Sequence, residues 1–420
     1  MGEQLESADL RTRAPKRRRA VIASAIAVLV VAAAISVLNN DSAPETTVAS
    51  RDHAHPSLTV TSGDDNDGQG EDDGETTSST HHHHPTTTTS TTDDTPVIPT
   101  PPTVTTLPVH PPTTLLPHDN RLTEWPTDGD SDAGGLVADL HGNVWYTVWP
   151  DVVGRINAAT GHRTVFHTPT PNSSPDDIVV GPDGALWFVE QSVQRIGRID
   201  GDGDITEFST GDLWPFRLTV GSDGALWFIA NHSWANDHPL GQLGRLTVNG
   251  EFTYYALGSE LQSIATGPDG YLWISDIPMD HPPYAASIYR VRNDATIVST
   301  YVIPPPNADE VGVIWDVTPG PDDAMWFTYG LSSSGSIGRM TTSGDYELFD
   351  NDGLWPTFLA WVGDELWFNG RNVDKIGKRS LTGHLTTMPA DSPDKIAAGP
   401  DGNVWFVEGF PTNAIARYRL

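Results

Sequence analysis

From residue 120 to the C-terminus the chain repeats one short pattern of apolar and polar positions. Between Gly181 and Asp200 the pattern reads GPDGALWFVEQSVQRIGRID, which is a polar turn, an apolar and aromatic run, a polar bend and a second apolar run. Short apolar runs bounded by Gly, Pro and Asp are typical of β-strands joined by tight turns. The pattern therefore predicts a β-hairpin, and its recurrence predicts a protein built from such hairpins.

Seven copies of the hairpin follow one another, and each is marked by one tryptophan: Trp145, Trp187, Trp227, Trp273, Trp326, Trp367 and Trp405. In each copy we expect an apolar strand such as Ile178 to Val180, the Trp strand, a strand with a Gly-Arg element, and an aromatic outer strand such as Ile205 to Phe208. Four short strands repeated about every forty residues are typical of propeller blades. The predicted fold class is all-β, a seven-bladed β-propeller over residues 120–420.

The two ends of the repeat region complement each other. The seventh copy ends at Leu420 after its third strand, whereas Leu122 to Trp125 stands alone before the first copy and matches the outer-strand pattern. We expect this N-terminal strand to complete the last blade, because pairing the first strand with the last removes the open sheet edge. The alternative is an open solenoid with an idle leading strand.

The first 38 residues have the pattern of a membrane anchor. Residues 1–19 form a basic tail, and residues 20–38 read AVIASAIAVLVVAAAISVL, without a charge. Nineteen helical residues span about 28 Å, enough for the hydrocarbon core of a bilayer. Because the positive charges precede the apolar run, we expect a single-pass signal anchor with a cytoplasmic N-terminus and an extracellular propeller. The alternative is a cleaved signal peptide.

Residues 39–119 change in composition to Thr, Pro, Ser, Asp and Gly. Such a segment lacks the apolar residues needed for a core, so we expect a disordered stalk, with O-glycosylation left open. Four consecutive histidines, His81 to His84, are more typical of a solvated run in such a tract than of a metal site.

Net charge and cysteine content limit the classes of binding partner and metal site that are compatible with this sequence. The formal charge is −31 and the chain has no cysteine. Repulsion from phosphates disfavours nucleic acid, and the lack of thiols excludes disulfides and thiolate metal sites. We expect no nucleic-acid partner and membrane contact through residues 20–38, while the oligomeric state stays open.

The order of elements GPDG-x-L-W-F, I-G-R and I-T-E-F resembles the streptogramin lyase (virginiamycin B lyase) family, over essentially all of residues 120–420. The resemblance implies a seven-bladed propeller. In active members it implies a Mg²⁺-dependent elimination that opens a cyclic depsipeptide antibiotic at its ester bond. It also implies histidines in a Pro-His-Gly/Ala-Ile motif at the inner strands of the last two blades, with glutamates nearby to hold the metal.

This chain departs from that motif at both places. Thr357 follows Pro356 in the sixth copy, and Asp394 follows Pro393 in the seventh, with Ser392 where the family has a glutamate. Glu408 only roughly matches a family carboxylate. We therefore expect the lyase machinery to be absent, and Mg²⁺ only if the protein is lyase-like after all.

Two insertions make the loops after the Trp strands of copies three and four longer than the others. They run from Asn231 to Gln242 and from Asp276 to Ser287 and bring candidate ligand-binding residues to the upper face, the side with the blade-to-blade links: His232, Trp234, His238, Met279, Asp280, His281 and Tyr284. Aromatic rings with a few polar groups at a concave mouth are typical of ligand recognition. The alternative is ordinary loops that cover exposed edges.

Charged residues also gather where the inner strands begin and the Trp strands end: Asp176, Asp177, Glu190, Arg217, Asp276, Asp316, Asp394, Lys395 and Glu408. Carboxylates that converge on a channel mouth raise one another's pKa or capture a cation. The alternative is that Arg217 and Lys395 neutralise them as structural pairs.

The sequence favours a non-catalytic, membrane-anchored module that binds an extracellular peptide, glycan or small molecule at the upper face. The alternative is an enzyme, either a divergent streptogramin lyase or another lyase or hydrolase. It would use His232, His238 or His281 with Glu190, Asp276 or Glu408. Fold alone does not decide between these, because propellers host both classes.

Overall fold

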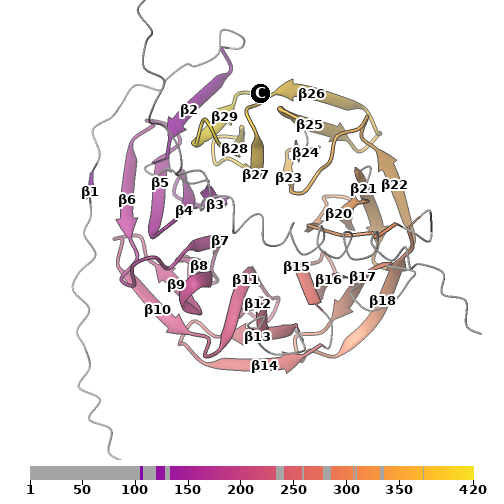
Figure 1. Ribbon diagram of the computed structural model, residues 1–420, viewed down its shortest axis with the longest axis horizontal. Coiled ribbons are helices and arrows are strands. Elements are labelled where there is room, and N and C mark those ends of the chain that lie inside the picture. The colour runs from indigo at the N-terminus through magenta and orange to yellow at the C-terminus, as the bar shows by residue number, and fades with distance from the viewer. Residues whose placement is uncertain are drawn as a thin grey trace, which may run out of the picture. The chain divides into compact units, whose positions relative to one another are not determined.

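Seven antiparallel sheets form a ring in the computed structural model, as Figure 1 shows. In each blade the strand that precedes the Trp strand lies nearest the centre, and the outer strand lies on the rim. The structure describes residues 105–106, 120–127, 133–232, 241–257, 260–277, 285–305, 307, 310–331, 335–371 and 373–420. The prediction of a seven-bladed all-β propeller is confirmed.

The first four blades each contain four strands in chain order. Their bounds are β3 (Ala133–Ala138), β4 (Asn143–Val148), β5 (Val152–Asn157) and β6 (Arg163–His167); β7 (Pro175–Val180), β8 (Leu186–Glu190), β9 (Arg195–Ile199) and β10 (Ile205–Ser209); β11 (Leu213–Val220), β12 (Leu226–His232), β13 (Gln242–Leu246) and β14 (Phe252–Ala256); β15 (Glu260–Thr266), β16 (Leu272–Ile277), β17 (Ala286–Val291) and β18 (Ile297–Ile303).

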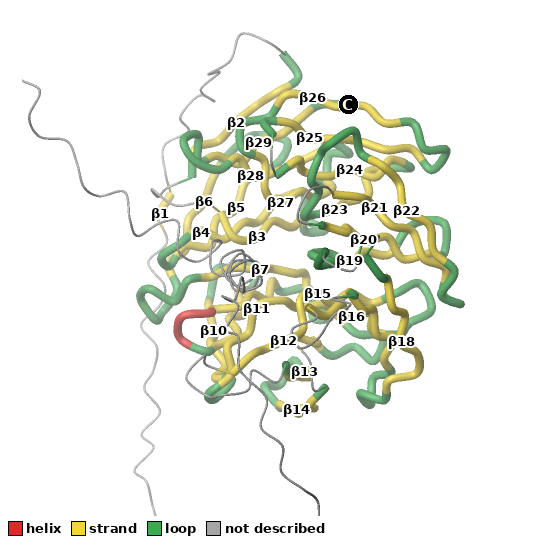
Figure 2. The backbone as a smooth tube through the Cα atoms, turned by 45° about the vertical axis from the view of Figure 1, so that its right-hand side comes forward, coloured by secondary structure: helices red, strands yellow, loops and turns green. Residues whose placement is uncertain are grey.

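The last three blades follow the same plan. Their bounds are β19 (Val317–Pro319), β20 (Ala324–Gly330), β21 (Gly335–Thr341) and β22 (Tyr346–Asp350); β23 (Leu359–Val362), β24 (Glu365–Gly370), β25 (Lys375–Ser380) and β26 (Leu385–Pro389); β27 (Pro393–Ala398), β28 (Val404–Glu408), β29 (Ala414–Tyr418) and the N-terminal β2 (Leu122–Pro126). A further two-residue strand, β1 (Thr105–Thr106), pairs with β6. Among the described residues, the one helical segment is a 3₁₀ turn, η1 (Gln191–Val193), drawn red in Figure 2.

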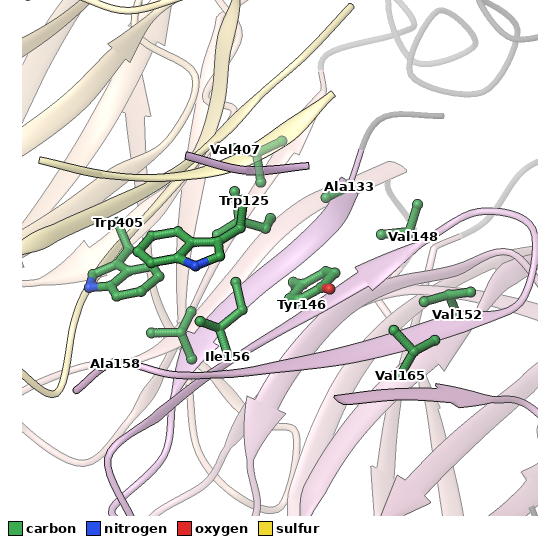
Figure 3. Packing of buried hydrophobic residues seen from close by; sticks show 12 residues of the cluster. Trp125, Ala133, Tyr146, Val148, Val152, Ile156, Ala158, Val165, Trp405 and Val407 are labelled. Atoms are coloured by element: carbon green, nitrogen blue, oxygen red, sulfur yellow. The ribbon is translucent and has the colours of Figure 1, made fainter. Parts of the chain in front are cut away.

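The ring is closed by its two ends. β2 pairs antiparallel with β29, with Leu122 opposite Tyr418 and Trp125 opposite Ile415. The Trp125 ring stacks on Trp405 at 4.9 Å between centroids, as Figure 3 shows. The predicted closure is therefore confirmed, and the open solenoid is excluded.

Each Trp side chain lies between two neighbouring blades. Trp145 packs in one cluster with Phe188 of the next blade, Trp187 packs with Phe228, and Trp405 packs with Tyr146 across the closing seam. All seven of these indoles are fully buried. The repeated Trp-aromatic pair of the sequence is thus the contact that joins one blade to the next around the ring.

In six of the seven blades the turn before the Trp strand supplies a carboxylate that accepts a hydrogen bond from the indole. In blade three the Asp223 carboxylate accepts a hydrogen bond from Trp227 Nε1 at 3.0 Å and pairs with Arg245 Nε at 2.7 Å. Burial opposes ionisation of Asp223, but these hydrogen bonds outweigh it and lower its pKa. The same Trp-Asp-Arg contact recurs in blades two, four, five and seven. The repeated turn and Gly-Arg elements therefore meet in space.

The glycine of the Gly-Arg element makes room for the aromatic ring that follows Trp. A Cβ atom on Gly244 would lie 2.1 Å from the Phe228 ring. Blade four has Tyr289 at this position, and its partner opposite is Ile274 rather than an aromatic residue. In five blades glycine and ring occur together because the ring fills the space that the glycine leaves, whereas blade seven places Ala416 opposite Phe406.

The predicted N-terminal elements lie outside the described residues. The basic tail 1–19, the anchor 20–38 and most of the stalk 39–119 belong to that part of the chain. Within the described ranges, no helix has the length and apolar character required to cross a membrane.

Replacing Trp125 with Ala should weaken the closing seam. The side chain is 5% exposed and stacks on Trp405, so Trp125→Ala should lower the free energy of unfolding by about 3–5 kcal/mol. Urea unfolding of the full-length chain measures this. Trp214→Ala is the control, because that ring is 38% exposed and its loss should change stability by about 0.5 kcal/mol or less. Equal stability of the two variants would contradict the role of Trp125.

Candidate functional site

The inner strands are irregular where they begin at the upper face. In blades two and seven the register with the Trp strand slips, between Pro175 and Ile178 and between Pro393 and Ile396. The register also slips in blades one, three and four. Such bulges redirect side chains from the regular pleat. The residues between the slips are Asp176 and Asp177 in blade two and Asp394 and Lys395 in blade seven.

In blades five and six, buried polar side chains hold the segments that precede the inner strands β19 and β23. Thr328 Oγ1 accepts hydrogen bonds from the backbone N–H groups of Trp315 and Asp316, at 3.2 and 3.1 Å. Asn369 Oδ1 accepts from the N–H groups of Thr357 and Phe358, at 3.0 and 2.8 Å. Thr328 and Asn369 are fully buried and were not among the predicted site residues. The sequence contains an indication of both residues, because each is a polar residue two positions after the Trp of an otherwise apolar strand.

Seven residues from five blades form what we term the mouth cluster: Asp176, Asp177, Arg217, Asp316, Phe358, Asp394 and Lys395. Arg217 Nη1 lies 3.7 Å and Lys395 Nζ lies 3.9 Å from the same Asp177 oxygen. Both cations also lie over the Phe358 ring, at 5.1 and 3.9 Å from its centroid. One aromatic ring therefore contacts both positive groups.

Most carboxylates of the mouth cluster already hold one structural hydrogen bond. Asp177 accepts from Leu218 N at 3.0 Å, Asp316 from Leu359 N at 2.9 Å, and Asp176 from Gln191 Nε2 at 2.9 Å. Burial raises the pKa of Asp316 to about 6 and also raises that of Asp176. Arg217 and Lys395 act in the opposite direction on both groups.

The two cations respond differently to the same surroundings. Burial disfavours the charge of Arg217, but the mouth carboxylates outweigh it and raise the Arg217 pKa. Burial and repulsion from Arg217 lower the pKa of Lys395, and Asp177, Asp176 and Asp394 only partly offset this. The six charged side chains thus interact as one electrostatic group.

Glu190 lies outside the mouth cluster. Its side chain is 0% exposed at the end of β8. Burial and, to a smaller extent, the nearby Glu207 raise its pKa to about 8, although Ser173 and Arg195 oppose the shift. The enclosed carboxyl group therefore favours its protonated form at neutral pH.

Glu408 occupies the corresponding place in blade seven. It is 0% exposed, and it accepts a hydrogen bond from Asp391 N at 3.0 Å. Burial raises its pKa to about 8, with smaller contributions from the charges of Glu124 on the closing strand and of Asp391, while the hydrogen bond from Asp391 N opposes the shift. Its surroundings are the closing seam, not the mouth cluster.

Asp276 supports the base of the second insertion. Its carboxylate accepts hydrogen bonds from Ser287 N at 2.9 Å and from the Tyr289 hydroxyl at 2.6 Å. Burial raises its pKa against the effect of these bonds. Both oxygens are therefore engaged within blade four.

The structure brings together only part of the predicted site. Arg217 and Asp394 belong to the mouth cluster, whereas Glu190, Asp276 and Glu408 do not. The insertion residues lie outside the described residues or, for His232, have an undescribed side chain: His232, Trp234, His238, Met279, Asp280, His281 and Tyr284. Phe358, on which both cations stack, was not predicted.

Histidines with a described side chain lie away from the channel. His141, His162 and His384 are in turns between strands, and His167 is on the outer strand β6, 3.2 Å from Asp151. Throughout the described part of the chain, no three His, Asp or Glu side chains gather in a way that could hold a metal ion.

This chain is similar to known proteins in sequence and in architecture. The model of the virginiamycin B lyase family matches residues 110–277 and 231–420. A virginiamycin B lyase from Nocardia farcinica (strain IFM 10152) is 38% identical over 102 residues, which are 24% of this chain and 36% of that protein. The chain thus spans about a third of the length of this curated relative.

Solved structures resemble the propeller over nearly their whole length. A streptogramin B lyase structure is 26% identical with a TM-score of 0.60, covering 71% of this chain and 97% of its own. A catalytically inactive histidine-to-alanine variant of virginiamycin B lyase from Staphylococcus aureus, solved with quinupristin, is 28% identical with a TM-score of 0.59, covering 71% and 99%. Hydrazine synthase from Kuenenia stuttgartiensis, 14% identical with a TM-score of 0.56, covers 72% and 99% and shares the fold alone.

Glu190→Gln should remove one source of pH-dependent stability. The pKa of Glu190 is 4.5 in the ordinary state and about 8 in the fold, so the folded chain binds the extra proton between these values. The contribution of Glu190 to the free energy of unfolding is fully present below pH 4.5, the unfolded-state pKa. It is lost as the pH rises through about 8, the folded-state pKa. E190Q should therefore gain stability relative to the unmodified chain as the pH rises from about 5 to about 9.

Urea midpoints across this pH range measure the difference. The matched control is Glu347→Gln, because Glu347 is exposed on β22. A difference between E190Q and the unmodified chain that stays constant with pH would contradict the shifted pKa.

Proposed function

The chain belongs to the virginiamycin B lyase family, and we propose that it is a binding propeller of that family. Its upper mouth holds an extracellular peptide, glycan or small molecule and lacks the elimination chemistry of the active members. The proposal rests on the residues that occupy the family's histidine motif in blades six and seven.

Thr357 is the first of these residues. Its side chain is 2% exposed, and its hydroxyl accepts a hydrogen bond from Asn369 Nδ2 at 2.7 Å. A buried hydroxyl that holds an inner strand in place is not a base for abstracting a proton next to a carbonyl, which requires a pKa near neutral pH. This position therefore supports a structural role.

Asp394 and Lys395 are at the second position. Asp394 replaces the motif histidine, and the Lys395 ammonium lies 3.9 Å from the Phe358 centroid. Glu408, the nearest match to a family carboxylate, is enclosed at the seam and interacts with Glu124 and Asp391. Together with Thr357 and Ser392, these residues do not fit a Mg²⁺ site, so we derive no step through a metal.

The same residues suit binding. Charged groups from blades two, three, five and seven lie close together, and the two cations among them lie over one aromatic ring from blade six. A concave mouth with an aromatic surface and a few charged groups is typical of polar-ligand recognition. Such a site discriminates ligands through the charges at its wall.

We further propose that residues 20–38 anchor the chain, with residues 1–19 in the cytoplasm and the propeller outside the cell. The proposal is supported by the uncharged run of nineteen residues after the basic tail. Residues 39–119 then serve as a disordered stalk between membrane and propeller.

Incubation with quinupristin and Mg²⁺ tests the absence of lyase activity. We expect mass spectrometry to detect no linearised product from the full-length chain. The virginiamycin B lyase from Staphylococcus aureus serves as the positive control. A linear product that depends on Mg²⁺ and on this chain would overturn the non-catalytic proposal.

Deletion of residues 20–38 tests the anchor. The full-length chain should remain in the membrane fraction after a carbonate wash, and protease added to intact cells should remove the propeller. The deletion variant should leave the membrane fraction. Release of the unmodified propeller into the medium would instead indicate signal-peptide cleavage.

A further inference from the structure

The two cations of the mouth cluster have unused hydrogen-bond donors. Arg217 and Lys395 are only 16% and 12% exposed, yet within the described residues neither donates a hydrogen bond of ordinary length. Both side chains are partly exposed, and none of their nitrogen atoms is among the buried unpartnered polar atoms of the described residues. The donors that make no hydrogen bond are therefore available to a group that enters from solvent.

Ion-pair distances show how the structural Arg–Asp pairs of this protein differ from the contacts that Arg217 and Lys395 make with Asp177. The Arg–Asp pairs Arg245–Asp223 and Arg290–Asp269 are direct, at 2.7 and 2.6 Å. The corresponding distances from Arg217 and Lys395 to Asp177 are 3.7 and 3.9 Å. The separation leaves the donors of both cations available to an oxyanion.

The mouth cluster also has unused acceptors. Asp394 makes no hydrogen bond within the described part of the chain, and only one oxygen of Asp176 accepts one. One oxygen of Asp316 has a long contact of 3.4 Å with Ser263. A cationic ligand group would meet these acceptors without breaking a bond inside the protein.

The charge balance decides between ligand classes. Four carboxylates surround two cations, so a simple anion is repelled by the carboxylates and a simple cation by Arg217 and Lys395. A ligand that carries both charges satisfies both sets at once. An α-amino acid or the termini of a short peptide have this chemistry, with a planar carboxylate suited to the guanidinium.

We propose that the mouth cluster binds a zwitterion of the amino-acid class, with its carboxylate at Arg217 and Lys395 and its ammonium at Asp394 and Asp316. The Phe358 ring contacts both cations, which lie 3.7 and 3.9 Å from the same Asp177 oxygen. This inference deepens the proposed binding function and rests on it, because it names the ligand class of that site.

Calorimetric titration of the purified full-length chain tests the proposal. The probes are glycine and glycylglycine, which differ in the separation of their charges, and sodium acetate and methylammonium chloride, which carry one charge each. We expect saturable binding of at least one zwitterion and no binding of acetate or methylammonium at matched concentrations.

Substitutions locate the binding. Lys395→Met and Asp394→Asn should each weaken zwitterion binding about tenfold or more, since each removes a charge-assisted hydrogen bond. Lys375→Met and Asp364→Asn are the matched controls, because both positions are exposed in blade six, and they should leave binding unchanged. Near-ultraviolet circular dichroism confirms folding, and Asp394→Asn keeps the side-chain shape if Lys395→Met does not fold.

Three results would overturn the inference. Equal binding of acetate would indicate an oxyanion site, and equal binding of methylammonium would indicate a cation site. No binding of any probe would indicate an internal charge network. None of these results bears on lyase activity, so failure of this inference is distinguishable from failure of the proposed function.

Discussion

The contact on which the ring depends is the packing of each blade's indole against the next blade. The same indole is fixed within its own blade by a turn carboxylate, as Asp223 fixes Trp227, and by an aromatic ring of the outer strand. Blade six departs from this scheme, because Gly363 stands where the aspartate would be and Lys378 pairs with Glu365 at 2.6 Å instead. The ring tolerates the change because the Trp367 side chain stays buried between its neighbours.

The fold was predictable because its determinants are local and repeated. Glycine, aspartate and tryptophan recur at a fixed spacing, and the pattern can be recognised within a single blade without reference to the others. The closing strand was predictable for a different reason: Leu122 to Trp125 lacked neighbours, and the last blade lacked a strand. What the spacing did not reveal is that the turn carboxylate and the Gly-Arg arginine bind each other across the hairpin.

The site was predictable only in part, because its residues come from different blades. Sequence position identified Arg217, Asp394 and Lys395 as residues near the axis. It did not show that Phe358 lies beneath both cations. It also placed Glu190 and Glu408 near the axis from their position at the ends of Trp strands, whereas packing encloses both side chains within their blades. Burial of a charged side chain depends on contacts that the spacing of residues does not encode.

The closing strand also has a consequence for synthesis. Thr127, just after β2, donates a backbone hydrogen bond to Asn413, a residue 286 positions later. At the usual rate of translation, roughly 15 to 60 s pass between the emergence of these two segments from the ribosome. During that interval β2 has no partner and the nascent ring has an exposed edge. The last blade can therefore close only after β29 has been synthesised, and β2 and β29 have to reach the same compartment before this blade can assemble.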